Sequence, residues 1–377
     1  MYCRYGNDDI VNLIRKNFFM AVLDSEAIEE RFSQSQNDLV LQSSDFSLKG
    51  LTDMVDSEII DLSPKYQRRE RWKPDRQSLL IESFILNVPV PPIYLAEEEY
   101  GIYSIIDGKQ RITAVSDYLN NSFALRGLEE FPELNGARFR DLPKSIQGAL
   151  RVRPYLRVIT LLKQSHPRLK YEVFIRLNRG GIRLNNQEIR NVAFRGPLND
   201  QIYDAASDAF LRAALKIDGP KSSAFQQMQD AEYVLRFLTL AESWTEFSGS
   251  LSKSMDEFML ENKTVSAQRA RELTDPFYTA ISRVQTLWGD RAFQRWDGER
   301  WRNQALAGLY DAQMIAAMML TSEQLDGLEG KQNAIKEKTK DLFLDSDFEE
   351  SVRLGTNTPS RIRYRIDQML LTLIDLL

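Results

Sequence analysis

Residues 107–111 read Asp-Gly-Lys-Gln-Arg, and their types and spacing could bind a phosphate group. They join a short apolar run, 102–106, to a segment with helical periodicity. A helix that starts directly after a strand leaves its first backbone N–H groups without intrahelical partners. Gly108 lets the backbone approach a ligand closely, and Lys109 and Arg111 add positive charge. The junction therefore predicts an anion site; the alternative is a tight turn with two solvated cations.

Asp107 is the unexpected member of this run. A carboxylate beside a phosphate group is repelled unless it holds a cation, a ribose hydroxyl or an arginine. Mg²⁺ binds phosphate together with one or two carboxylates, so we expect Asp107 to hold this ion or to orient a water molecule. Lys109, Arg111 and the helix N–H groups would stabilise charge that develops on the phosphoryl oxygens.

Two further segments carry groups that suit phosphate. Residues 65–76 contain six basic residues and two acidic ones, a local charge of +4, with Tyr66 and Trp72 among them. The loop 178–188 has a Gly-Gly pair at its centre, and four arginines surround it: Arg176, Arg179, Arg183 and Arg190. Phosphate would satisfy the donors of both segments. The alternatives are a solvated basic loop pinned by Trp72 and a well-capped helical hairpin.

Two helix starts stand out along this part of the chain. Asn185 followed by Glu188 fits a capping box, and Gly196-Pro197 ends the expected helix. Ser165 and Pro167 flank His166 and predict another helix start, with Ser165 as the cap. We therefore expect His166 to lie in a helix cap rather than in a catalytic site.

Composition limits the chemistry that the chain can perform. The 377 residues are 43% hydrophobic and 27% charged, with a net charge of -5, as in ordinary soluble globular proteins. Cys3 and His166 are the only cysteine and the only histidine, which excludes an intrachain disulfide, a cysteine-based zinc site and most histidine-dependent catalysis. We expect no membrane span, no signal peptide and a cytoplasmic location.

The pattern along the chain predicts an N-terminal arm at 1–44, a domain of strands and helices at 45–198 that contains the predicted anion site, and a helical domain at 199–377. In the arm, a helical stretch is expected near 10–23 and a mobile loop at 33–38. The run Glu97-Glu98-Glu99 is expected to be the turn of a hairpin. No strand-like alternation is found after residue 199, and the tryptophans there are expected to fill the core.

Several spaced motifs together resemble a known family. They are Tyr66-Gln67-Arg68 with Trp72, Ile106 to Arg111, Phe174 to Gly181, Leu184 to Glu188, and Asp230 with Arg236-Phe237. In this order they are similar to the N-terminal domain of GmrSD-type modification-dependent restriction endonucleases. The resemblance covers about residues 45 to 240. It implies an α+β fold, in which a ParB/sulfiredoxin-like small mixed sheet with helices precedes a largely α-helical C-terminal region.

The resemblance implies a module of prokaryotic defence that binds and hydrolyses a nucleoside triphosphate with Mg²⁺. Carried over residue by residue, it places Asp107, Gly108, Gln110 and Arg111 at the phosphates, with Gln67 and Arg68 nearby. The Asn178-Arg179-Gly180-Gly181 loop and Asn185 would line the same pocket. Lys109 stands where the family has glutamine, which could change nucleotide preference or rate.

The family's nucleases usually carry a C-terminal His-Asn-His-type domain, which one histidine cannot build. The resemblance is therefore to the sensor half in stand-alone form, acting with a separate nuclease or effector protein. The alternative function is a module that binds DNA or a protein without nucleotide turnover. A third is a Mg²⁺-dependent nuclease that uses Asp107 with Glu188.

Overall fold

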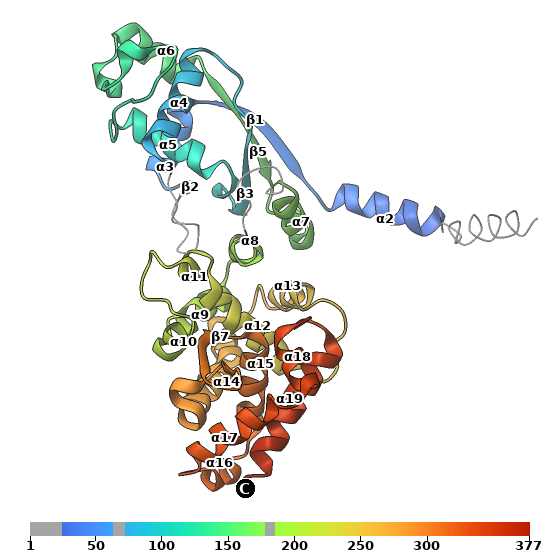
Figure 1. Ribbon diagram of the computed structural model, residues 1–377. Helices are drawn as coiled ribbons and strands as arrows, with labels where there is room; N and C mark the ends of the chain where they lie inside the picture. The colour runs from blue at the N-terminus through green and yellow to red at the C-terminus, as the bar shows by residue number, and fades with distance from the viewer. Residues whose placement is uncertain (1–24, 63–71, 178–184) are drawn as a thin grey trace, which may run out of the picture.

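The computed structural model describes residues 25–62, 72–177 and 185–377, and a five-stranded mixed sheet forms the centre of its N-terminal half (Figure 1). The strands are β1 (Leu41–Ser47), β2 (Ile60–Asp61), β3 (Ile93–Glu99), β4 (Ile102–Asp107) and β5 (Tyr155–Leu161). Their order across the sheet is β1-β5-β3-β4-β2. The pairs β1–β5 and β3–β4 are antiparallel, whereas β3–β5 and β2–β4 are parallel. Parallel pairing brings the carboxyl ends of β2 and β4 to the same edge of the sheet.

Alternation along the strands gives the sheet two apolar faces. Ile93 and Leu95 belong to one hydrophobic cluster, whereas Ala96 belongs to the other. Four helices carry the first cluster: α3 (Leu48–Asp56), α4 (Pro74–Ile85), α5 (Lys109–Leu119) and α6 (Lys144–Val152). The second cluster contains α7 (Pro167–Leu177) and α8 (Asn186–Ala193) and continues into the C-terminal helices.

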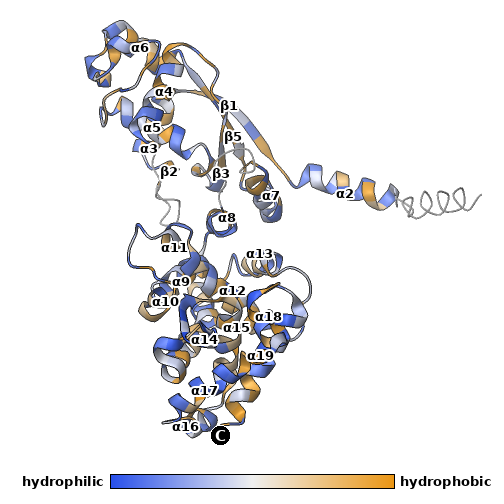
Figure 2. Ribbon diagram, viewed as in Figure 1, coloured by the Kyte–Doolittle hydropathy of each residue, from blue (hydrophilic) through white to orange (hydrophobic). Residues whose placement is uncertain are grey.

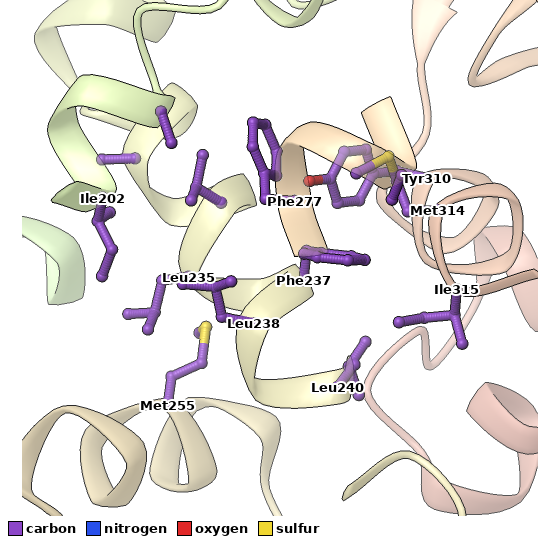
Figure 3. Close-up of a cluster of buried hydrophobic side chains, with 14 of the residues drawn as sticks. Ile202, Leu235, Phe237, Leu238, Leu240, Met255, Phe277, Tyr310, Met314 and Ile315 are labelled. Carbon is purple, nitrogen blue, oxygen red and sulfur yellow. The ribbon is translucent and has the colours of Figure 1, made fainter. Parts of the chain in front are cut away.

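The C-terminal region is almost entirely helical (Figure 1). Its longer helices are α9 (Pro197–Ala205), α12 (Gln229–Ser243), α13 (Leu251–Glu261), α14 (Ala267–Trp288), α15 (Ala307–Met319), α17 (Gln332–Leu342), α18 (Ser346–Arg353) and α19 (Pro359–Ile374). Short helices lie between them: α10 (Ala209–Ala214), α11 (Ser223–Gln226) and α16 (Ser322–Gly327). Figure 3 shows the centre of the packing, where the buried rings of Phe237 and Phe277 meet edge to face. The architecture confirms the predicted α+β class.

None of the helices in the described ranges combines the length and apolar character needed to cross a lipid bilayer. The domain boundaries that we expect at residues 44 and 198 stay predictions. The stretch 10–23 lies outside the described residues.

Helix α2 corrects the loop predicted at 33–38. It spans Ser25–Asn37 and buries none of its residues. Figure 2 shows hydrophobic residues interspersed among hydrophilic ones along it. Its glutamates and glutamines are good helix formers, so the polar composition that suggested a loop is also compatible with an exposed helix.

The C-terminal region is largely helical, as predicted, but it contains one pair of strands that the sequence did not reveal. Strands β6 (Gln294–Trp296) and β7 (Trp301–Ala305) form an antiparallel hairpin, in which Trp296 and Trp301 contact each other edge to face. The two strands have only three and five residues. Segments this short do not show the alternation that distinguishes a strand in sequence.

The glutamates expected in a turn lie within strand β3 instead. Glu97 is buried, and its carboxylate accepts hydrogen bonds from the backbone N–H groups of Gly101 and Lys163. The side chain of Glu98 accepts a bond of 2.7 Å from the Ser104 hydroxyl. Glu97 and Glu98 therefore stabilise the β3–β4 hairpin, whereas Glu99 is exposed and pairs with Lys163.

Candidate phosphate site

The β4–α5 junction depends on glycine at position 108. Gly108 precedes the first residue of α5 and has φ +99°, a backbone conformation that favours glycine. A Cβ atom there would lie 2.8 Å from Cγ1 of Ile93. No side chain caps the first turn of α5. The junction therefore brings bare backbone and the start of a helix to one point, as the sequence predicted.

Arg111 fixes the position of Asp107. The two side chains form an ion pair across the first turn of α5. Nη1 of Arg111 also donates to the carbonyl oxygens of Pro91 and Pro92, at 2.6 and 3.1 Å. The Arg111 side chain is 12% exposed and that of Asp107 is 41% exposed. A carboxylate beside a phosphate site needs a cation, a ribose hydroxyl or an arginine as its partner. In the structure the partner of Asp107 is an arginine, Arg111.

Gln110 joins the first basic segment to this junction. The backbone N–H of Trp72 donates to Oε1 of Gln110, at 3.0 Å. The guanidinium of Arg76 lies 4.5 Å from the centre of the Trp72 ring, a cation–π contact. Gln67 and Arg68 lie outside the described residues. Trp72, which belongs to the same basic segment, is hydrogen-bonded to the first turn of α5.

The capping box predicted before the second helix is present. Oδ1 of Asn185 accepts from the Glu188 N–H at 2.8 Å, and the Glu188 carboxylate accepts from the Asn185 N–H at 2.7 Å. Nδ2 of Asn185 donates to the Gln227 carbonyl oxygen at 2.8 Å. Asn185 therefore ties the start of α8 to the end of α11. Residues 178–181, predicted to line the same pocket, lie outside the described residues.

A comparison with known families decides what this segment is. Residues 51–195 match the family model described as GmrSD restriction endonuclease, N-terminal domain. Residues 51–195 form a GmrSD N-terminal domain. A domain of this family indicates a role in a restriction system. No curated protein and no solved structure matches the chain.

At the end of the GmrSD N-terminal domain, Arg195 makes a contact that the sequence did not reveal. Its Nη1 pairs with Oδ2 of Asp61, at 3.2 Å. Nε and Nη2 of Arg195 are buried and have no hydrogen-bond partner among the described residues. Asp61 ends β2, so the pair anchors the chain directly before residues 63–71. The partners are 134 positions apart, and no local pattern announces such a contact.

Lys170 and Lys263 carry buried amines on the side of the sheet that faces α8. Nζ of Lys170 donates to the Glu97 carbonyl oxygen and Nζ of Lys263 to that of Ala193, each at 3.1 Å. Burial lowers the pKa of both ammonium groups, and the Glu98 carboxylate partly offsets this. Their hydrogen bonds to backbone give both lysines a structural role between the sheet and the helices.

Two of the arginines expected around the second loop have carboxylate partners in the described structure. Arg190 is fully buried, and its Nε pairs with Oδ1 of Asp256, at 2.6 Å. It joins α8 to α13, so the partner of its guanidinium in the described structure is a carboxylate. Arg176 is exposed and lies 3.5 Å from Glu172 on the same helix. Arg179 and Arg183 lie outside the described residues.

His166 lies at a helix start, as predicted, but Ser165 is not the cap. Nδ1 of His166 accepts from the Arg168 N–H at 3.2 Å, and its carbonyl oxygen accepts from Leu169. The Ser165 hydroxyl instead hydrogen-bonds the backbone of Val40, at 3.0 and 3.1 Å. Ser165 therefore attaches the chain before β1 to the start of α7, a tertiary contact that competes with capping.

Proposed function

We propose that this chain binds a nucleoside triphosphate at the β4–α5 junction and hydrolyses it, acting as a sensor or switch in a restriction system. The observation that carries the proposal is a contact between the basic segment 65–76 and the β4–α5 junction. Trp72, in the described part of this segment, donates its backbone N–H to Oε1 of Gln110. A described residue of the segment predicted to hold phosphate thus contacts the turn predicted to hold phosphate.

The roles at the junction follow from charge. Lys109 and the first N–H groups of α5 would attract phosphate oxygens, and Arg111 neutralises Asp107, which would otherwise repel them. In the reaction, water attacks the terminal phosphorus and the bond to the bridging oxygen breaks, which gives a nucleoside diphosphate and phosphate.

Mg²⁺ would neutralise charge on the phosphates, and Asp107 is the residue that would hold it. The described residues contain no group of three or more carboxylates, histidines or cysteines placed to hold a metal ion. Mg²⁺ in nucleotide sites commonly uses one or two carboxylates and takes its other ligands from phosphate and water. The Asp107 carboxylate is half-exposed, and because Arg111 pairs with its Oδ2, the ion would be held by Oδ1.

The test is phosphate release from each of the four ribonucleoside triphosphates with Mg²⁺, with and without DNA. Arg111→Ala should abolish binding or turnover. Arg269→Ala is the matched control, because it removes an exposed arginine of the helical region whose partner, Glu272, also lies at the surface. Turnover that survives Arg111→Ala would remove the assignment of this site.

An alternative function is binding of DNA or a protein by the same basic segments, without turnover. Residues 65–76 carry a charge of +4, which favours it. DNA affinity that falls steeply with salt, together with no heat of nucleotide binding in calorimetry, would support this alternative. A nuclease that uses Asp107 with Glu188 is not supported, because Glu188 is buried within the cap of α8.

In the proposed system a separate nuclease or effector protein would respond to the nucleotide state. A cytoplasmic location agrees with this role. Co-purification of the chain with proteins encoded beside it, with and without added nucleotide, would identify such a partner.

A further inference from the structure

The chain concentrates positive charge in one segment away from the β4–α5 junction. Residues 138–157 contain six basic residues and one acidic residue, a local charge of +5, whereas the whole chain has a net charge of -5. This segment contains α6 and the start of β5. In Figure 1, α6 lies at the end of the molecule opposite the C-terminal helices.

The cations around α6 are solvent-exposed and mostly unpaired. Lys144, Arg151 and Arg153 are exposed, and none of them forms an ion pair within the described ranges; the Arg151 guanidinium lies 5.1 Å from the centre of the Phe139 ring. Next to them, two side chains that are usually buried stand out in solvent, Val152 at 59% and Tyr155 at 65% exposure. A surface of unpaired cations beside an exposed aromatic ring suits a partner with many negative charges.

Gly148 makes this surface unusual. It lies in the middle of α6, where glycine lowers helix stability relative to alanine. Yet a Cβ atom at Gly148 would meet no heavy atom within 4 Å, so packing in the described structure does not require glycine there. Lys144, Gly148 and Arg151 follow the i, i+4, i+7 spacing of one helix face. This face of α6 therefore has a cation at each end and a residue without a side chain between them, which permits close approach of a ligand.

We propose that the outer face of α6 binds the phosphate backbone of double-stranded DNA. The α6 surface comprises Lys144, Ser145, Gly148, Arg151, Arg153 and Tyr155. Its cations and hydroxyl groups are the donors that contact DNA phosphates in proteins. DNA is the polyanion that a restriction system encounters, so the choice of partner rests on the family match and not on nucleotide hydrolysis.

An anionic membrane fits this surface less well. Membrane-surface helices bury a broad apolar face in the lipid. The apolar residues Ile146 and Leu150 of α6 already pack in the cluster on the first face of the sheet. Val152 is then the one aliphatic side chain of α6 that is largely exposed. The helix can present cations to phosphate, but it has no apolar face left to insert.

Binding of a fluorescently labelled DNA duplex by the full chain, followed by anisotropy over a series of salt concentrations, tests the proposal. Arg151→Ala/Arg153→Ala should weaken binding and reduce the slope of log affinity against log salt by about 2, one for each lost phosphate contact. Lys221→Ala/Lys338→Ala, which removes two exposed lysines of the helical region, should leave the slope unchanged.

The substitution Gly148→Ala distinguishes an effect on DNA binding from an effect on folding stability. It should raise the melting temperature, because alanine favours the helix, and at the same time weaken duplex binding. The proposal is overturned if both arginine substitutions leave duplex affinity and slope unchanged, or if they abolish binding to phosphatidylserine vesicles but not to the duplex. Nucleotide turnover, measured on the same variants without DNA, should equal that of the unmodified chain. A loss of the DNA-binding proposal would therefore not affect the proposal that nucleotide binds at the β4–α5 junction.

Discussion

Arg111 and Asp107 form an ion pair across the first turn of α5, and the same guanidinium holds the carbonyl oxygens of Pro91 and Pro92. One side chain thus links the end of β4 to the connector before β3. It also cancels the negative charge nearest to the proposed phosphates. The stability of the junction and its affinity for anions therefore depend on the same residue.

Replacement of Arg111 should show both effects. Arg111→Ala leaves three acceptors without their donor and should lower the free energy of unfolding by about 1–3 kcal/mol. It also leaves Asp107 uncompensated, so nucleotide binding should disappear. Arg111→Lys can neutralise Asp107 but cannot reach all three acceptors, and should retain part of the binding. Urea denaturation and titration calorimetry on the folded variants measure the two effects separately.

Gly108 gives a second prediction, based on backbone geometry. Gly108→Ala must adopt φ near +99° and places its Cβ 2.8 Å from Ile93, so it should cost about 1–3 kcal/mol of stability. Gly101→Ala is the matched control. Gly101 has φ +79° but no heavy atom within 4 Å of its Cβ position, so only the backbone cost of about 1 kcal/mol applies. Equal losses of stability in the two variants would show that the contact with Ile93 has no effect.

The features that sequence predicted correctly depend on neighbours along the chain. The turn at Gly108 and the capping box of Asn185 and Glu188 are each set within a few residues. The α+β class follows from periodicity over single elements. These features can be predicted from the sequence because the residues that determine them are close together along the chain.

The features that sequence missed depend on distant partners. Arg195 and Asp61 are 134 positions apart, and Arg190 and Ser252 are 62 apart. An arginine gives the same local pattern whether it will meet a phosphate or a buried carboxylate. Arg190 was therefore expected beside a ligand loop, although packing of α8 on α13 buries it.

A buried group of three charges holds the C-terminal helices together and should be sensitive to neutralisation. Asp311 on α15 accepts from Arg236 on α12 at 2.5 and 2.6 Å and also pairs with Arg365 on α19. Asp311→Asn leaves two buried guanidinium groups without a counter-charge and should cost about 3–5 kcal/mol.

Asp53 supplies the control for this substitution. It forms an ion pair with Lys49 at the surface, where both side chains are about half exposed, so Asp53→Asn should change stability by less than about 1 kcal/mol. Chemical denaturation of the two variants at neutral pH makes the comparison. A small effect of Asp311→Asn would mean that the helices hold together by apolar packing alone.

Tyr364 and Asp345 predict how stability changes with pH. The Tyr364 hydroxyl donates to Oδ2 of Asp345, which lowers the pKa of Asp345 below its ordinary 3.8 and raises the pKa of Tyr364 to about 12. The lowered pKa of Asp345 stabilises the fold above pH 3.8, and this contribution is lost as the pH falls through the lowered value. The raised pKa of Tyr364 stabilises the fold below pH 10.0, and this contribution is lost as the pH rises toward 12.

Tyr364→Phe should remove the alkaline contribution entirely. It should also move the pKa of Asp345 back toward 3.8, although not fully, because the Asp347 N–H still donates to this carboxylate at 2.9 Å. Stability curves at acid and alkaline pH, together with NMR titration of the Asp345 carboxyl carbon, measure both changes. An unchanged Asp345 titration in Tyr364→Phe would show that the hydrogen bond to tyrosine does not cause the shift.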